Sequence, residues 1–474
     1  MSQSGDHLKS GQLGTADVTA STVANIGPGI DFYFGFGVIA VTAGVAAPLT
    51  ILAATVAVSL LAFTVAEFTK AEPSAGSFIT YVETALGARA GVATALLVTV
   101  GYTVAIAAVF TMSGGLVAMT LSHYTSWHPW WGPFSLVLTA GGIWLTARGV
   151  KLSTTAVGAA VFVQVAIMAV VCVIVLVDQR GDLSGIPFSW AHLTGGLAGL
   201  SAGFPLALFM FIGWENGPAL AEESRDPRRT IPRALYISVA VAAALLVFFA
   251  YATVTGFRYD VSSIGRSSVP FLTVADRYLG GAGVLAWVAG IVSVLATLVA
   301  GADSQSRMLF DGGRAGLLPA KLGQVRPRSG TPVNALLFMA AAALGIIGVW
   351  WVSRLITGDT RSMDPVGLYA ECSTMATIVI LFVYFLTMLS LPVFMWRRHR
   401  DSFSPLRHVA IPVLGSITLI VPFVELCQPG QAAPYSAFPF LALAIGAAAA
   451  VIACVVLHRH PRTGTGEGAA HPGG

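Results

Sequence analysis

The chain has 474 residues, of which 55% are hydrophobic and only 10% are charged, and its formal net charge is +4. A soluble globular protein carries about 25% charged residues, and a fold with so few charges cannot cover its surface with polar groups. Disorder is excluded as well, because a disordered chain combines low hydrophobicity with high net charge. The composition therefore predicts an all-α protein whose helices span a membrane.

Twelve apolar segments of roughly helical length follow one another along the chain. A helix that spans a bilayer needs about 20 predominantly apolar residues. The predicted segments are residues 18–45, 48–69, 91–121, 131–147, 152–177, 198–221, 232–257, 279–302, 332–352, 366–392, 408–426 and 435–457. They predict one transmembrane domain over residues 18–457, with a polar tail over 1–17 before it and a Gly-rich, disordered tail over 458–474 after it.

Lysine and arginine are distributed unevenly between the two sides that twelve crossings would create. If both termini are cytoplasmic, the inner side carries 20 of the 26 basic residues and the outer side carries six. Cytoplasmic loops of membrane proteins are enriched in Lys and Arg. The distribution therefore predicts a multi-pass protein of the plasma (cell inner) membrane with both termini in the cytoplasm.

Two of the segments contain helix-breaking residues near their middle, at 25–31 (NIGPGID) and 211–218 (FIGWENGP). Gly and Pro weaken the backbone hydrogen bonds of a helix. An unwound backbone at membrane depth is tolerated where protein or a water-filled cavity satisfies its polar groups. Interruptions at corresponding places of two halves predict a central binding site in a transporter with inverted repeats. The alternative is that these residues only kink or pack the helices.

Three motifs on the predicted inner side occur in the same order in a known family. Residues 67–77 (EFTKAEPSAGS) are similar to its E-L-x(4)-P-x-A-G-G motif after helix 2, and residues 221–233 (AEESRDPRRTIPR) to its A-E-E-x-x-N-P-R-R-x-I-P-R run after helix 6. Residues 306–307 (SR), 313–319 (GRAGLLP) and 330–332 (GTP) resemble its elements after helix 8. The chain thus resembles the amino acid–polyamine–organocation transporters, which have the LeuT-type fold.

The resemblance implies two inverted repeats of five helices, at about 18–177 and 198–392, followed by two further helices at about 408–457. Helices 1 and 6 would unwind at mid-membrane and bind the substrate together with helices 3, 8 and 10. In the family, amides of helix 1 receive the substrate carboxylate, while helix 6 supplies carbonyls for its ammonium group and an aromatic gate. The implied substrate-binding residues are Ile26, Gly27, Gly29, Ile30, Asp31, Phe209, Phe211, Ile212, Gly213 and Trp214, with Phe209, Phe211 or Trp214 as the gate.

Two residues of the first break depart from the family pattern. Pro28 stands in the middle of its G-S-G triplet and has no N–H, so Gly27, Gly29 and Ile30 remain as amide donors. Asp31 stands where the family has an apolar residue. A carboxylate near the bilayer centre is costly and is a functional candidate: it could hold a substrate ammonium, accept the coupling proton, bind a cation, or hydrogen-bond a neighbouring helix. Both departures shift the site toward amine-rich or cationic cargo.

The coupling ion is expected to be a proton. Glu215 lies in the second break, where burial would favour the protonated form of its carboxyl, so Glu215 and Asp31 are the proton-coupling candidates; a structural hydrogen bond to freed amides is the alternative for Glu215. Some proton-coupled relatives have a lysine in helix 5, where this sequence has only Gln164. Ser293 and Thr297 are weaker candidates for a cation site beside helix 1, since isolated Ser and Thr in membrane helices mostly bond their own backbone.

These features predict a permease, a secondary active transporter that moves an amino acid or a closely related amine by alternating access. A carrier or exchanger of polyamines or organic amines, and a non-transporting membrane sensor on the same fold, are the alternatives. No nucleophile–base pair or metal-ligand cluster occurs within the predicted spans, so we expect no enzyme activity, no cofactor, no metal centre and no nucleic-acid partner. Symport and antiport fit the sequence equally, and no oligomeric state is predicted.

Overall fold

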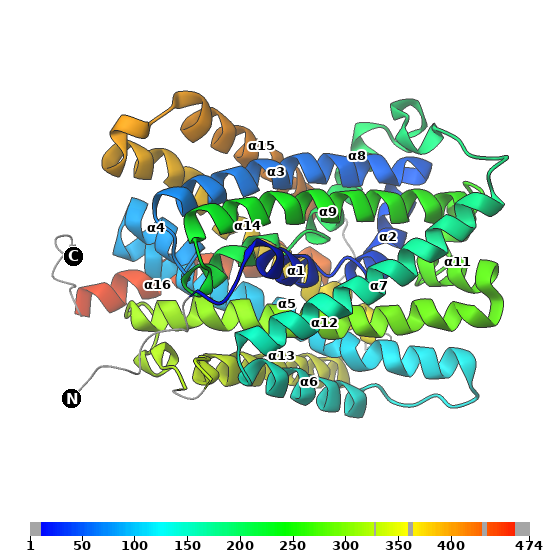
Figure 1. The fold of residues 1–474 in the computed structure, drawn as a ribbon, viewed down its shortest axis with the longest axis horizontal. Coiled ribbons are helices and arrows are strands. Elements are labelled where there is room, and N and C mark those ends of the chain that lie inside the picture. Colours follow the sequence, from blue (N-terminus) through cyan, green and yellow to red (C-terminus); the bar gives the residue numbers. More distant parts are fainter. Residues whose placement is uncertain (1–10, 327–328, 359–363, 429–433, 460–474) are drawn as a thin grey trace.

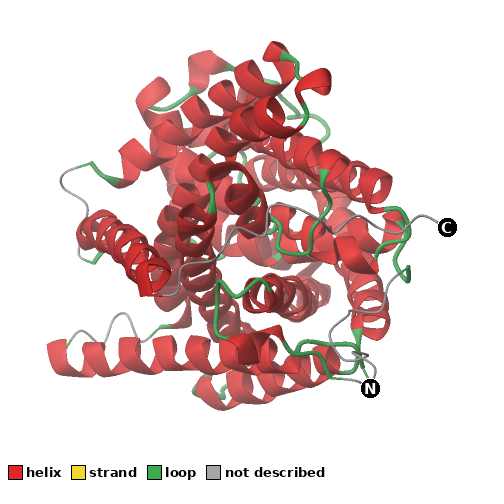
Figure 2. Cartoon of the chain, turned by 90° about the vertical axis from the view of Figure 1, so that its left-hand side faces the viewer, coloured by secondary structure: helices red, strands yellow, loops and turns green. Residues whose placement is uncertain are grey.

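The computed structural model describes residues 11–326, 329–358, 364–428 and 434–459. Within these ranges the chain is helical and has no β-strand beyond two isolated bridges, and Figure 2 shows helices joined by loops. The predicted all-α class is therefore confirmed. The predicted C-terminal tail lies outside the described residues, apart from the two residues that end the last helix.

The helices range from single turns to rods that run the length of the bundle (Figure 1). The α-helices are α1 (Thr15–Ile26), α2 (Ile30–Ala43), α3 (Ala47–Ala71), α4 (Phe78–Leu86), α5 (Ala88–Tyr124), α6 (Gly132–Ala147), α7 (Val150–Asp178), α8 (Leu197–Phe209), α9 (Pro227–Gly256), α10 (Val261–Gly265), α11 (Pro270–Leu279), α12 (Val284–Arg314), α13 (Val333–Thr357), α14 (Pro365–Arg398), α15 (Ile411–Leu426) and α16 (Phe438–Arg459). The 3-10 helices are η1 (Gly44–Ala46), η2 (Ile186–Phe188), η3 (Trp190–His192), η4 (Trp214–Glu223), η5 (Gly280–Gly283), η6 (Ala320–Gly323), η8 (Arg400–Ser402) and η10 (Tyr435–Ala437). A π-helical turn, η9 (Leu406–Ala410), precedes α15.

Eight helices or joined helix pairs in the described ranges are long and apolar enough to cross a membrane. Three shorter apolar helices accompany them: α6, α8 and the stretch Leu406–Val421. Length and composition thus give a multi-pass helical bundle. The count of twelve crossings stays a prediction.

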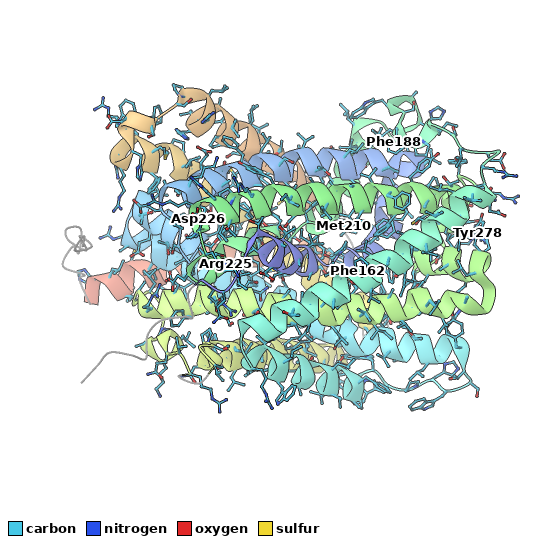
Figure 3. The ribbon with its side chains drawn as sticks, viewed as in Figure 1. Phe162, Phe188, Met210, Arg225, Asp226 and Tyr278 are labelled. Carbon is cyan, nitrogen blue, oxygen red and sulfur yellow. The ribbon has the colours of Figure 1, made fainter. Side chains whose placement is uncertain are left out.

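The bundle has two distinct ends. Figure 3 places Arg225 and Asp226 at one end and Phe188 and Tyr278 at the other, with Met210 between them. We call the end that carries Arg225 the basic end, and the other the opposite end. Met210 directly follows α8 and is 0% exposed, so the second break lies in the interior, about midway between the ends.

The centre of the bundle consists of α5, α12 and α14. Helix α5 packs along both α14 and α12, and α12 also packs against α7 and α1. The outer helices expose large apolar side chains instead: Phe162 of α7 is 76% exposed on the outside of the bundle (Figure 3), and Ile356 of α13 is 80% exposed. Apolar surface of this extent is solvated by lipid in a membrane protein, whereas a soluble monomer would bury it.

A buried ion network joins three elements at the basic end. Arg307 of α12 is 0% exposed, and its guanidinium donates hydrogen bonds to the carboxylates of Glu223 in η4 and of Asp303 one turn earlier (Nη1–Oδ1 2.8 Å). The carbonyl oxygen of Glu223 accepts hydrogen bonds from the N–H groups of Gln12 (2.8 Å) and Leu13 (3.0 Å). The segment before α1, η4 and α12 are therefore held together at this end.

Candidate substrate site at the two helix breaks

The first break separates α1 from α2 in the middle of the bundle (Figure 1). Helix α1 ends at Ile26, and Gly27 follows with a φ of +64°. The N–H of Gly27 donates to the carbonyls of Val23 (3.2 Å) and Ala24 (3.1 Å), which caps α1. A left-handed residue at this position is usually glycine, so the sequence encodes the helix end directly. Helix α2 begins three residues later at Ile30.

The second break follows Phe209, the last residue of α8. The backbone turns at Gly213, which has a φ of +110°, and continues as the 3-10 helix η4. A Cβ atom at Gly213 would lie 2.6 Å from the carbonyl oxygen of Asn25, so only glycine fits there. The side-chain Nδ2 of Asn25 donates to the carbonyl of Gly213 at 3.1 Å. The two breaks therefore contact each other directly.

Two hydroxyl groups of α12 hold the first break in place. The N–H of Ile30 donates to Oγ of Ser293 at 3.1 Å. Oγ1 of Thr297 donates to the carbonyl of Ala24 at 2.8 Å. The expectation that these hydroxyls bond their own helix is therefore wrong, because both bond the backbone of the first break instead.

Asp31 joins the first break to α14. Its carboxylate accepts a hydrogen bond from the hydroxyl of Tyr369, and the residue is only 7% exposed. Asp31 lies in the first turn of α2, where the positive end of the helix dipole favours an anion. Of the alternatives that the sequence left open for Asp31, the structure shows the hydrogen bond to a neighbouring helix.

Glu215 joins the second break to α5. Its carboxylate is 0% exposed and accepts two hydrogen bonds, one from the hydroxyl of Tyr102 and one from the N–H of Gly213 at 2.9 Å. A structural hydrogen bond to freed backbone amides was the alternative role predicted for Glu215 from the sequence, and the bond from the Gly213 N–H is such a contact. A carboxyl with these partners can also exchange a proton, since Tyr102 lies beside it and lines a cavity.

A small cavity of about 40 Å³ lies between the two breaks. It is lined by Asn25, Asp31, Tyr102, Ala105, Ile106, Val109, Phe209, Ile212, Gly213, Thr297, Gln305 and Tyr369. A water molecule takes about 30 Å³ in the liquid, so an amino acid enters only if side chains move. Among the described residues, Oε1 of Gln305 is a buried acceptor without a hydrogen-bond partner, and it offers a bound molecule a polar contact.

A second cavity, of about 440 Å³, lies between α2, α8 and α14. Phe209 and Tyr369 line both cavities, and their rings lie 6.2 Å apart and nearly perpendicular. These two rings therefore separate the larger cavity from the small one. Of the three candidate gate residues only Phe209 has this position. Phe211 and Trp214 are 0% and 1% exposed and line neither cavity, so they are packing residues in this conformation.

Other predicted site residues lie beside the cavity without lining it. The N–H of Gly27 is used by α1 and that of Ile30 by Ser293, so the expectation of three free amide donors is wrong for two of them. In the part of the chain that is described, Gly29 N–H has no acceptor. The predicted residues outside the cavity lining are Ile26, Gly27, Gly29, Ile30, Phe211, Trp214, Glu215 and Ser293; those within it are Asp31, Phe209, Ile212, Gly213 and Thr297.

Sequence reasoning did not single out Tyr102, Tyr369 or Gln305 as site residues. All three lie on helices, α5, α14 and α12, that the family resemblance placed around the substrate. A polar or phenolic side chain in an apolar run was the available signal. The chain has nine other tyrosines, so this signal alone does not select Tyr102 and Tyr369; the cavity lining does.

Comparison with known proteins identifies the family. The model of the family described as amino acid permease matches residues 20–460. The chain belongs to the amino acid permease family. It is 26% identical over 391 residues to the branched-chain amino acid permease BcaP of Bacillus subtilis, covering 76% of this chain and 80% of BcaP.

Two further relatives agree with this membership. The uncharacterized amino acid permease YecA of Bacillus subtilis is 27% identical over 315 residues, which cover 64% of this chain and 69% of YecA. The D-serine/D-alanine/glycine transporter of Escherichia coli K12 is 26% identical over 225 residues, which cover 45% of each chain. The predicted family is confirmed, and the chain is a multi-pass membrane transporter of the amino acid permease type.

Proposed function

We propose that this permease carries a small amino acid across the plasma membrane by alternating access, coupled to protons. The observation that carries the proposal is the cavity between the two breaks, which a carboxylate lines and two aromatic rings cover. Unwound helices in the interior present backbone polar groups to a bound molecule. A transporter needs such a site, with a barrier that can open on each side.

The proposed topology has twelve crossings with both termini in the cytoplasm. The transmembrane domain covers residues 18–457, with inverted repeats at about 18–177 and 198–392 and two further helices at about 408–457. The breaks support this arrangement, since α1–α2 and α8–η4 fall near the beginning of the two proposed repeats. Arg225 lies at the basic end (Figure 3) and shares its stretch of chain with Arg228, Arg229 and Arg233, which supports the placement of this end in the cytoplasm.

We propose that the cargo lies between α2 and the turn before η4. Its carboxylate would take the N–H of Gly29 near the positive end of α2, and its ammonium would face Asp31 and the carbonyls of the second break. The cavity of about 40 Å³ favours a short side chain, because a longer one displaces more of the lining. One relative is named for D-serine, D-alanine and glycine, and we propose small cargo of that size.

Proton coupling is proposed for Glu215, with Asp31 as the second candidate. Both carboxyls are buried, and each contacts a tyrosine that lines the cavity. Burial in an apolar interior disfavours the charged form of a carboxyl, so cargo binding and protonation become linked. Ser293 and Thr297 support a sodium site less well, because their hydroxyls already bond the first break.

Asp31 also favours a second candidate function, a carrier of organic amines. A buried anion beside the cavity would attract a cation that has no carboxylate of its own. Such a cargo would not need the amide donors of the first break, two of which are already occupied.

The test is uptake by purified protein in liposomes. Radiolabelled glycine, alanine, D-serine, leucine and putrescine are supplied under an imposed pH gradient or an imposed sodium gradient. We expect accumulation of a small amino acid under the pH gradient alone. Accumulation of putrescine alone would replace the amino acid proposal with the amine carrier. No accumulation of any compound under either gradient would favour a membrane sensor.

A further inference from the structure

A polar pocket opens at the basic end, away from the two breaks. It has a volume of about 400 Å³ and is lined by Trp144, Ala147, Arg148, Arg326 and Ser329. The first three of these residues lie at the end of α6, and the last two belong to the loop that leads into α13. Helices α6 and α13 contact each other and lie together along one edge of the bundle (Figure 1).

The pocket concentrates positive charge without a compensating carboxylate. Arg148 and Arg326 are both exposed, and the lining contains no Asp or Glu among the described residues. Other arginines of this end differ: Arg307 and Arg314 each contact two carboxylates. Two unopposed guanidinium groups that share a pocket form a site for an anion.

The pocket also contains an arginine that packs on an aromatic ring and a polar group that has no partner among the described residues. The guanidinium of Arg148 lies over the ring of Trp144, with Cζ 4.3 Å from the ring centroid, which restrains the arginine. A Cβ atom at Gly149 would lie 3.3 Å from the carbonyl oxygen of Ser329, so the two loops approach closely. In the described chain, Oγ of Ser329 is buried and has no hydrogen-bond partner. A bound anion would provide the missing acceptor.

The surface next to the pocket is apolar. Trp144 is 58% exposed, and Leu136 and Val137, earlier on α6, are 57% and 70% exposed. Leu337 of α13 is 54% exposed. The pocket is charged, lies at the end of a lipid-facing helix and has a tryptophan at its rim. These features are typical of the depth at which lipid headgroups meet acyl chains. An anion bound there would have its acyl chains beside α6 and α13.

We propose that this pocket binds the phosphate of an anionic phospholipid, with Arg148 and Arg326 as the phosphate ligands and Trp144 at the level of the glycerol backbone. A headgroup phosphate accepts hydrogen bonds from two guanidinium groups and from a serine hydroxyl at once. Basic pockets between transmembrane helices on the cytoplasmic side are a known form of lipid headgroup site. The proposal does not depend on the cargo or on the coupling ion.

Native mass spectrometry of the purified full-length protein tests the proposal. The protein is titrated with dioleoylphosphatidylglycerol or with dioleoylphosphatidylcholine, which have the same acyl chains. We expect the first phosphatidylglycerol to bind about tenfold or more tightly than phosphatidylcholine, and the variant R148Q/R326Q to lose about 10- to 30-fold in that affinity. Equal binding of the two lipids, or equal affinity of the variant and the wild type for phosphatidylglycerol, would overturn the proposal.

A matched control distinguishes binding at this pocket from a general attraction between the lipid and positive charge. Arg400 lies over Trp396, 4.6 Å from the ring centroid, and Arg407 is exposed nearby, yet neither residue lines the pocket. The variant R400Q/R407Q removes the same charge and is expected to bind phosphatidylglycerol as the wild type does. An equal loss in both double variants would overturn the site in favour of non-specific attraction.

Two further experiments distinguish a lipid phosphate from a soluble phosphate and provide a conservative variant. Excess sn-glycerol 3-phosphate is expected not to displace the lipid; displacement at equal affinity would overturn the lipid assignment in favour of a soluble phosphate. The variant R148K/R326K keeps the charge but loses the planar guanidinium forks, and we expect it to keep part of the preference. R148K/R326K thus tests the site even if R148Q/R326Q is unstable. If R148K/R326K showed no preference for phosphatidylglycerol over phosphatidylcholine, the proposal would be overturned.

Discussion

Asp31 is the residue on which the chemistry of the proposed site depends most. A carboxylate in the interior of a membrane protein is stable only with specific partners, and Asp31 has two: the hydroxyl of Tyr369 and the positive end of α2. It also lines the cavity, so a cargo ammonium can reach it. Tyr369 covers the same cavity, and its hydrogen bond to Asp31 therefore links the charge of the site to the position of one gate ring.

The variant Asp31→Asn tests the ammonium role. It removes the charge and keeps a similar shape, so we expect uptake of a cationic cargo to fall by about tenfold or more, which corresponds to about 1.4 kcal/mol, and uptake of a neutral amino acid to fall less. Uptake in liposomes measures both. Tyr369→Phe is the control, because it keeps the ring and the charge of Asp31. Equal loss for both cargoes in D31N would reject the ammonium role.

The variant Glu215→Gln tests proton coupling. Glutamine can keep the hydrogen bonds with Tyr102 and Gly213 but cannot take up a proton. We therefore expect E215Q to exchange labelled for unlabelled cargo across liposomes at a rate near that of the wild type, and to lose accumulation driven by a pH gradient. Tyr102→Phe, which keeps the carboxyl, should retain the driven accumulation. Full accumulation by E215Q would remove Glu215 from the coupling mechanism.

At the scale of single residues, the sequence predicted the charged groups better than their partners. Asp31 and Glu215 stand out because acidic residues are rare in apolar segments. Tyr102 and Tyr369 do not, because the nine other tyrosines of the chain give the same signal without lining the cavity. Their roles depend on how α5 and α14 rotate against the breaks, and packing decides that rotation.

At the scale of elements, the two breaks are encoded by glycines that cannot be replaced. Gly213 combines a φ of +110° with a backbone contact to Asn25, so a side chain there meets strain and a clash together. Gly27 also has a positive φ, of +64°, and a Cβ atom there would lie 2.6 Å from the side-chain Oγ1 of Thr297 on α12. The site geometry thus follows from local backbone chemistry and from the close approach of three elements.

The variant Gly213→Ala should destabilise the protein by about 1–3 kcal/mol, the cost of a strained backbone conformation, and should abolish uptake. The control is Gly141→Ala on α6, where an added Cβ meets nothing within 4 Å; alanine there is expected to leave stability unchanged or to raise it slightly. Thermal unfolding in detergent and liposome uptake measure the two effects. A G213A protein as stable and active as G141A would contradict the close contact between the breaks.

Sequence patterns predicted the long helices and both breaks, but not the short helices. Long apolar runs predicted the large helices, and Gly and Pro predicted both interruptions, because each effect acts within a few residues. The short helices α4, α10 and α11 were not predicted. Helices of ten residues or fewer are too short to span a bilayer, so hydropathy does not mark them, and their positions depend on contacts with the long helices.

At the scale of the whole molecule, contacts between elements far apart in the sequence lie on two sides of the small cavity. Phe209 and Tyr369 cover it on the side of the larger cavity. At the basic end, Arg307 joins η4 to α12 through Glu223 and Asp303. The ion network therefore holds η4 against α12 at this end and contributes to the stability of this conformation.

The variant Arg307→Met should lower stability by about 3–5 kcal/mol, because it leaves two buried carboxylates without their cation. Arg314→Met is the control: its side chain is 32% exposed and that of its partner Glu222 is 29% exposed, while its buried partner Asp311 keeps the hydrogen bond from Thr80 at 2.9 Å, so the loss should be smaller. The shift in unfolding temperature of each variant in detergent gives the comparison. Equal shifts would contradict the dominant role of the buried network.

A cryo-electron microscopy map of the protein with saturating alanine would test the proposed substrate site. We expect density for alanine between Asp31 and the turn at Gly213, beneath Phe209, with α1–α2 and α8–η4 still interrupted. Continuous helices in place of either break, or a cavity filled by hydrocarbon side chains with alanine bound elsewhere, would contradict it.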